Sequence, residues 1–204
     1  MRNTALLLLA SLMLAGCATD INLINASRYH EAGLRAEWSG DYKAAEEYFK
    51  RSLINARDGH ASDSVMSMSM YNLGRMKGLN CQYDEAHTLL TASLKLQDKI
   101  SGPENALFSK RLFELARLSY DRKQYAEAAD YYARAIPLGQ KLGLEIHDPG
   151  AAAEAMDEYS IALRNSGRIQ PADKIAADAE ALRARSANAK PKYTFQRYTR
   201  TCSG

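Results

Sequence analysis

The sequence has few of the residues from which metal sites and common catalytic sites are built. Only three of its 204 residues are cysteine, and no cysteines are paired at the spacing of a zinc site. The four histidines are scattered and form no His-Glu-x-x-His motif: His30, His60, His87 and His147. A glycine-rich phosphate loop and a Gly-x-Ser-x-Gly turn are also missing. We therefore expect no cofactor, no metal and no enzymatic activity. The remaining alternative is an enzyme assembled from residues that lie far apart in the sequence.

A large excess of charge of one sign is absent as well. The chain has 27 basic and 24 acidic residues, which gives a formal net charge of +3 at pH 7. Domains that bind nucleic acids usually carry a stronger basic patch or stripe. We expect no nucleic acid among the partners.

The apolar run near the N-terminus is too short for a membrane anchor. It follows Arg2 and extends from Ala5 to Leu14, whereas a spanning helix needs about 20 apolar residues. A positive start followed by a short apolar run is typical of a secretory signal peptide. Next comes the sequence LAGC, in which the small residues Ala15 and Gly16 fit a peptidase cleft just before Cys17.

The order Leu-Ala-Gly-Cys resembles the lipobox of bacterial lipoproteins. The resemblance implies a lipoprotein signal peptide at residues 1–16, acylation of Cys17 with chains such as palmitate, and a lipidated tether at residues 17–25. Several acyl chains on one cysteine anchor a protein firmly. An aspartate after the cysteine usually means retention in the inner membrane, but Ala18 stands here. The resemblance therefore implies the periplasmic face of a Gram-negative outer membrane. An ordinary signal peptide with a chance cysteine is the alternative.

Two cysteines remain beyond the lipidation site, Cys81 and Cys202. An oxidising compartment would permit a disulfide between them. The favoured interpretation leaves them unpaired, with Cys81 as a small apolar residue in a turn.

The segment GDYKAAEEYFKRSL, residues 40–53, has three further copies, the last one weaker. Each copy is anchored on a residue after a turn, and these anchors are 41, 42 and 44 residues apart: Tyr42, Tyr83, Tyr125 and Ile169. An alanine stands three residues after every anchor, and a small residue stands nine before it. Positions three, seven and ten residues after the anchor are similar in the copies, and residues at this spacing lie on one face of a helix. The pattern predicts helical hairpins that approach closely at the small residues and must stack on neighbours to bury their faces.

These positions resemble the tetratricopeptide repeat over residues 26–185. The match is closest in YNLGRMKGLNCQYDEAHTLLTASL and LFELARLSYDRKQYAEAADYYARAI. The usual period of that family is 34 residues, and the longer intervals here are similar to the long-helix subtype typified by kinesin light chain. The segment Ser101-Gly102-Pro103 breaks the helix where that subtype has a loop. The resemblance implies an all-α, right-handed solenoid of about four stacked hairpins.

The same resemblance implies a partner-binding groove along the first helix of each hairpin. Positions carried over from the family give eight residues for this groove: Tyr71, Arg75, Lys110, Phe113, Arg117, Tyr120, Arg164 and Asn165. Arginine binds carboxylates directionally, and tyrosine and arginine are favoured at binding hot spots. We therefore predict a basic and aromatic groove for an acidic or C-terminal segment of a protein partner. The alternative is a set of ordinary solvated charges over a packed core.

The composition changes in the last segment, residues 186–204. It contains Pro191 and several basic and aromatic residues, but no helical period. Residues 192–200 alternate and could add as a strand or lie extended on a partner. A flexible tail is the favoured interpretation.

These features together predict a lipid-anchored periplasmic scaffold that helps to assemble or localise an envelope machine. In layout the chain is similar to the pilotin lipoproteins of type IV pili. An adaptor that recruits peptidoglycan hydrolases or synthases is the second interpretation. A periplasmic enzyme or a carrier of a small ligand is the third.

Overall fold

The computed structural model describes residues 2–187, 189–192 and 197–198. Within these ranges all regular structure is helical. The helices are α1 (Arg2–Trp38), α2 (Tyr42–Asp58), α3 (Asp63–Leu79), α4 (Tyr83–Ser101), α5 (Ala106–Asp121), α6 (Tyr125–Lys141), α7 (Leu144–His147), α8 (Pro149–Asn165) and α9 (Ile169–Arg185). The predicted all-α class is confirmed.

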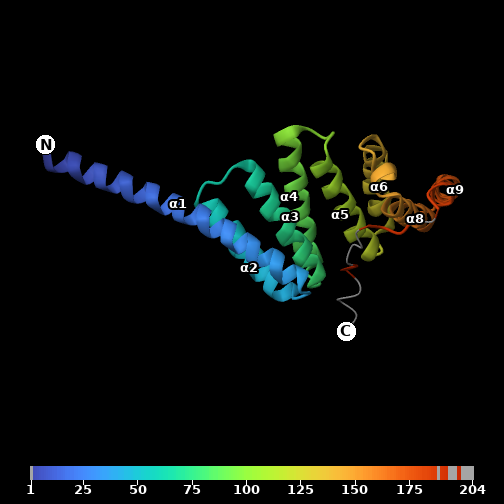
Figure 1. Cartoon of the computed structure of the whole chain (residues 1–204), viewed down its shortest axis with the longest axis horizontal. Coiled ribbons are helices and arrows are strands. Elements are labelled where there is room, and N and C mark those ends of the chain that lie inside the picture. The colour runs from blue at the N-terminus through green and yellow to red at the C-terminus, as the bar shows by residue number, and fades with distance from the viewer. Residues whose placement is uncertain (1, 188, 193–196, 199–204) are drawn as a thin grey trace.

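The long helices pair in chain order. Helix α1 packs on α2, α3 on α4, α5 on α6, and α8 on α9, while the short α7 lies between the third and fourth pairs. Neighbouring pairs stack through α2 and α3, α4 and α5, and α6 and α8. Figure 1 shows the pairs following one another along the long axis, with the first part of α1 extending beyond the body. The structure is the predicted solenoid of stacked helical hairpins.

Small residues lie where the two helices of a hairpin cross. The four alanines that follow the anchors are fully buried: Ala45, Ala86, Ala128 and Ala172. On the first helix of a hairpin, a Cβ added to Gly33 would lie 2.7 Å from the Phe49 ring. A Cβ added to Gly74 of α3 would lie 2.9 Å from Leu90 of α4, the second helix of the same hairpin. The large residue therefore fills the space that the small one leaves, as the repeat predicted.

The turn inside each hairpin uses a left-handed backbone two residues before the anchor. The four residues there have φ values between 60° and 80°: Gly40, Cys81, Lys123 and Gly167. Only glycine adopts this conformation without a steric cost. Cys81 and Lys123 are therefore strained by the same turn geometry that suits the two glycines.

Consecutive hairpins are also joined by polar contacts. The Glu46 carboxylate on α2 pairs with Lys77 of α3 at 2.9 Å. It also accepts hydrogen bonds from Asn80 at 2.7 Å and from Gln82 at 2.8 Å. One carboxylate thus holds the end of α3 and the following turn against the first hairpin.

Helix α1 runs without a break through the residues predicted as signal peptide and tether. Among the described residues, no helix combines the length and apolar character that a membrane crossing requires. The boundaries at residues 16 and 25 stay predictions.

Candidate functional site

The residues predicted to bind a partner lie on the first helices of three consecutive hairpins. We use the term first-helix face for the surface formed by α3, α5 and α8. Tyr71 and Arg75 lie on α3, and Arg164 and Asn165 on α8. Helix α5 carries the other four: Lys110, Phe113, Arg117 and Tyr120.

Two arginines of this face pair with glutamates of the next hairpin in the same way. The Nε atom of Arg75 lies 3.7 Å from Glu114 Oε2, and the Nε atom of Arg117 lies 3.7 Å from Glu158 Oε2. Arg75 also pairs with Glu37 of the preceding hairpin. The two arginines stand at equivalent positions of their repeats, and so do the two glutamates. Arg75 and Arg117 are therefore each neutralised by a carboxylate from the next hairpin.

The expected exposure of these side chains is wrong for Tyr71 and Arg117. Each is only 4% exposed, because stacking of the hairpins encloses them between first helices. The Tyr71 hydroxyl donates a hydrogen bond to Glu114 Oε2 at 3.1 Å. Their role in binding a partner stays a prediction.

Burial changes the ionisation of several groups on the face. It raises the pKa of the Glu158 carboxyl, although Arg117 and the Tyr132 hydroxyl favour the charged form. It also raises the pKa of the Tyr71 hydroxyl well above its ordinary value. The pKa of Lys110 is lowered by partial desolvation and then by the positive charge of Arg75. The charged form of the Glu158 carboxyl is consequently favoured by the cations beside it, Arg117 first.

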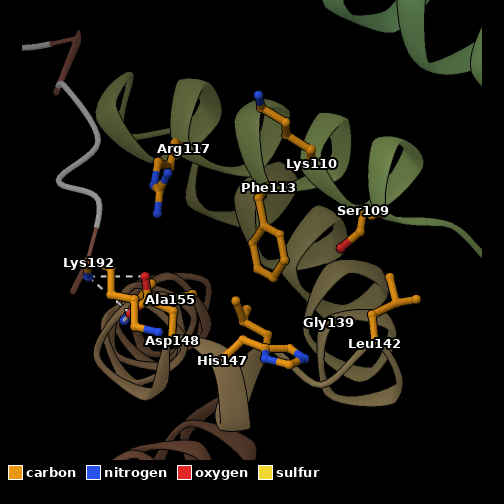
Figure 2. Close-up of a pocket in the computed structure, with 13 residues that line it drawn as sticks. Ser109, Lys110, Phe113, Arg117, Gly139, Leu142, His147, Asp148, Ala155 and Lys192 are labelled. Atoms are coloured by element: carbon orange, nitrogen blue, oxygen red, sulfur yellow. Dashed lines mark hydrogen bonds between the residues drawn. The ribbon is translucent and has the colours of Figure 1, made fainter. Parts of the chain in front are cut away.

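A cavity of about 460 Å³ opens between α5, the end of α6, α7 and the first turns of α8. Its walls are mainly apolar and include Phe113, Leu142, Leu144, Ala151 and Ala155. Figure 2 shows the Phe113 ring pointing from α5 toward His147, with Arg117 beside it. Three of the eight residues predicted for the groove line this cavity: Lys110, Phe113 and Arg117.

Basic groups surround the apolar walls. Lys110, Arg117, His147 and Lys192 line the cavity, together with one acidic residue, Asp148, whose carboxylate accepts from the Lys192 backbone N–H. The Lys110 ammonium lies 5.2 Å from the centre of the Tyr71 ring, which attracts the cation through its π electrons. An apolar cavity with a cationic rim suits an apolar group that carries a carboxylate. The described residues contain no cluster of histidine, cysteine and acidic side chains that could hold a metal ion.

Arg164 and Asn165 lie elsewhere. They occupy the end of α8, about 14–15 Å along the helix from the cavity residue Ala155 at about 1.5 Å per residue. Arg164 pairs with Asp173 of α9, and the Asn165 side chain donates to the Ile161 carbonyl. The structure does not bring these two residues into the cavity.

The sequence interpretation missed the acidic residues of the face. Glu114 and Glu158 both stand eleven residues before an anchor, so the repeat alignment contained a signal for them. It also missed Arg197 and Tyr198, for which the sequence offers no periodic signal. Tyr198 is 1% exposed and belongs to the same core cluster as Tyr71.

The described part of the C-terminal segment is packed on the solenoid, which corrects the expectation of a flexible tail there. The Lys192 backbone N–H donates to the Asp148 carboxylate at 3.1 Å (Figure 2). A Cβ added to Gly150 would lie 2.3 Å from the Pro191 nitrogen, so the segment passes directly over the first turn of α8. Contact with α8 and burial of Tyr198 hold these residues in place.

Cys81 differs from its expected state too. It is exposed in the turn between α3 and α4, and it is disulfide-bonded. The expectation of an unpaired, apolar residue was wrong because the turn presents its side chain outward. Cys202 lies outside the described residues.

No model of a known protein family and no curated protein sequence matches the chain. Solved structures do match. The structure of BtubC (BKLC) from P. vanneervenii aligns with a TM-score of 0.73 at 16% identity, covering 84% of this chain and 68% of that one. A putative kinesin light chain from Podosopora anserina, with nearly identical TPR-like repeats, aligns with a TM-score of 0.68 at 22% identity. That match covers 78% of this chain and 75% of the other. The chain has a TPR-like repeat fold.

TPR-like solenoids present extended surfaces on which other proteins bind. The first-helix face and its cavity are therefore the part of this TPR-like chain in which a protein-binding site is best sought.

Proposed function

We propose that this chain is a lipid-anchored scaffold on the periplasmic face of the outer membrane, where it helps to assemble or localise an envelope machine of the pilus or secretion type. The partner is a protein that inserts an acidic or C-terminal segment into the cavity of the first-helix face. The observation that carries the proposal is the combination of apolar walls and a basic rim in a cavity built by repeat residues. The anchor rests on the sequence LAGC at residues 14–17.

The cavity suits a segment end better than the middle of a chain. Phe113, Leu142 and Leu144 provide an apolar wall for one terminal side chain. Lys110 and Lys192 lie on its rim, and no ion pair of either is found within the described part of the chain. A terminal carboxylate between them would gain charge-assisted hydrogen bonds.

Crosslinking in living cells tests the proposal. We would place the photoreactive amino acid p-benzoylphenylalanine at position 106, because Ala106 is exposed on the cavity wall and is not one of the cations proposed to bind the carboxylate, and irradiate cells that make the lipidated chain. We expect one defined protein adduct, reduced at least five-fold by Lys192→Glu, because that change reverses a charge on the cavity rim. The same photoreactive group at exposed Lys50 of α2 is the matched control.

The identity and location of the adduct decide between interpretations. A pilus or secretion component that fractionates with the outer membrane supports the proposal, and Cys17→Ser should release the adduct from that fraction. A peptidoglycan hydrolase or synthase would favour the adaptor function instead. An adduct pattern equal to that of the Lys50 control would refute binding at the cavity.

A further inference from the structure

Two buried glutamates of the first-helix face each have one oxygen held by the solenoid. Glu114 is 6% exposed and Glu158 is 2% exposed. Oε2 of Glu114 accepts from the Tyr71 hydroxyl and lies near Arg75. Oε2 of Glu158 accepts from the Tyr132 hydroxyl and lies near Arg117.

The other oxygen of each glutamate is occupied by the C-terminal segment. The Tyr198 hydroxyl donates to Glu114 Oε1. The Arg197 guanidinium lies 2.5 Å from Glu158 Oε1 and 3.8 Å from Glu154. Tyr198 and Arg197 are neighbours in the segment, and each contacts one of these two buried glutamates. The two glutamates, Glu114 and Glu158, stand at equivalent positions of neighbouring repeats.

A third carboxylate fixes the direction of the segment. Asp121, at the end of α5, accepts from the Tyr198 backbone N–H at 2.8 Å through Oδ2. Its Oδ1 lies 3.3 Å from the Arg197 guanidinium. The Arg197 guanidinium and the Tyr198 backbone N–H thus share the Asp121 carboxylate. Both contacts can form together only when the segment runs in this direction.

The walls around these carboxylates fit the two side chains by shape. The Tyr198 ring lies against Gly78 of α3, where an added Cβ would be 2.3 Å from the ring. The Arg197 guanidinium stacks over the Tyr120 ring, with its carbon 5.5 Å from the ring centre. Gly78, which has no side chain, leaves room for the tyrosine ring. The flat ring of Tyr120 provides a surface for the arginine guanidinium.

We propose that these groups form a binding channel for an extended segment that carries arginine followed by tyrosine, and that Arg197–Tyr198 is its resident occupant. The channel is defined by Gly78, Glu114, Tyr120, Asp121 and Glu158. A partner that binds there brings the same pair and displaces Arg197 and Tyr198 from their contacts in the channel. This adds a second, acidic site to the first-helix face and shares with the proposed function only the premise that the face binds proteins.

The charges of the channel require that an incoming segment supply the same groups as Arg197 and Tyr198. Removing Arg197 without replacement would leave three buried or half-buried carboxylates with fewer cations, and an unpaired buried charge is strongly unfavourable. An acidic segment is therefore excluded from this channel by repulsion, and an apolar one leaves the carboxylates unsatisfied. Only a segment with its own cation and hydroxyl donor restores both contacts.

A peptide-binding experiment on the full chain tests the proposal. The probe is a fluorescent peptide with the sequence of residues 194–201, TFQRYTRT. The channel is emptied in the full chain by combining Arg197→Ala with Tyr198→Ala. We expect fluorescence anisotropy to show the probe binding this variant at least ten-fold more tightly than the unaltered chain, whose own segment competes.

Specificity is checked on both sides of the contact. A probe with alanine at the arginine and tyrosine positions should bind at least ten-fold more weakly. Adding Asp121→Asn to the emptied chain should also weaken the probe several-fold. Equal binding of the probe to the emptied and the unaltered chain, with helical circular dichroism retained, would overturn the proposal.

A milder variant covers the case in which the emptied chain does not fold. Tyr198→Phe keeps the buried ring and removes only the hydroxyl that donates to Glu114. The probe should bind this variant more tightly than the unaltered chain, and unchanged affinity would overturn the proposal. Because the assay needs no cellular partner, its failure leaves the crosslinking test at position 106 intact, and the reverse also holds.

Discussion

Lys123 follows α5 with a φ of 60°, at the position where two of the four repeats have glycine. For a residue with a Cβ, the left-handed conformation costs about 1–2 kcal/mol. The Lys123 side chain is exposed, and its backbone N–H donates to the Tyr120 carbonyl whatever the side chain is. The strain is therefore the main consequence of having lysine there.

We predict that Lys123→Gly raises the free energy of unfolding by about 0.5–1 kcal/mol, since relief of the left-handed strain exceeds the entropic cost of glycine. Urea denaturation followed by circular dichroism measures the change. Lys50→Gly in the exposed interior of α2 is the control and should lower stability by about 1 kcal/mol. A loss of stability on Lys123→Gly would contradict the strain argument.

The contacts between helices of different hairpins depend on single polar groups as well as on packing. Glu46 of α2 is the clearest case, because Lys77, Asn80 and Gln82 all converge on its carboxylate. Burial alone would raise the pKa of Glu46, but the hydrogen bonds from these three residues outweigh it and lower the pKa. The charged carboxylate consequently stabilises the stacking of the first two hairpins.

We predict that Glu46→Gln lowers the free energy of unfolding by about 1 kcal/mol at pH 7. A carboxyl with a lowered pKa in the folded state stabilises the fold above its ordinary pKa of about 4.3, and this contribution is lost as pH falls through the folded value. The difference between the two chains should therefore shrink below pH 4. Urea denaturation at several pH values measures it.

The neighbouring residue provides the control. Among the described residues, the ion pair of Glu47 is with Arg51 on the same exposed surface of α2, so Glu47→Gln should change stability by less than about 0.5 kcal/mol. A difference for Glu46→Gln that stays constant down to pH 3 would contradict the role of its charge.

Contacts within one hairpin could be predicted from the sequence, whereas contacts between hairpins could not. Offsets between an anchor and its alanine lie within one hairpin, so the sequence was enough to predict the crossings at Ala45, Ala86 and Ala128. The pairing of Arg75 with Glu114 joins separate hairpins, and its partner depends on how the units stack. The sequence therefore identified the basic residues of the first-helix face but not their neutralisation.

The C-terminal segment could not be predicted for a related reason. Tyr198 is buried by contacts with Gly78 and Glu114, which lie far earlier in the chain and on two different helices. A segment without helical or strand periodicity gives no local signal for such burial. The cavity was partly predicted, because Lys110, Phe113 and Arg117 came from repeat positions, whereas its walls on α7 and α8 did not.

At the scale of the whole molecule, the disulfide-bonded Cys81 and the buried Tyr198 ring both lie at the end of α3. The Tyr198 ring lies against Gly78, three residues before Cys81. Cys202 stands four positions after Tyr198, a reach of up to about 14 Å for an extended chain. Cys17 is the predicted lipidation site and is then blocked. We therefore predict that Cys81 pairs with Cys202.

Mass spectrometry of a proteolytic digest under non-reducing conditions should show the peptides of Cys81 and Cys202 as one linked species. Cys81→Ser should make Cys202 reactive toward a thiol reagent, while the unaltered chain stays unreactive. A link from Cys81 to Cys17, or a reactive Cys202 in the unaltered chain, would contradict this pairing.

The contact between Tyr198 and Glu114 spans 84 residues, which is unusual for a protein built from neighbouring units. Solenoids normally lose their terminal repeats first, since each unit is stabilised only by the adjacent ones. Here the last hairpin cannot fray without also pulling Arg197 and Tyr198 from the second and third hairpins. The returning segment therefore joins the second, third and fourth hairpins directly, so that their unfolding is coupled beyond nearest neighbours.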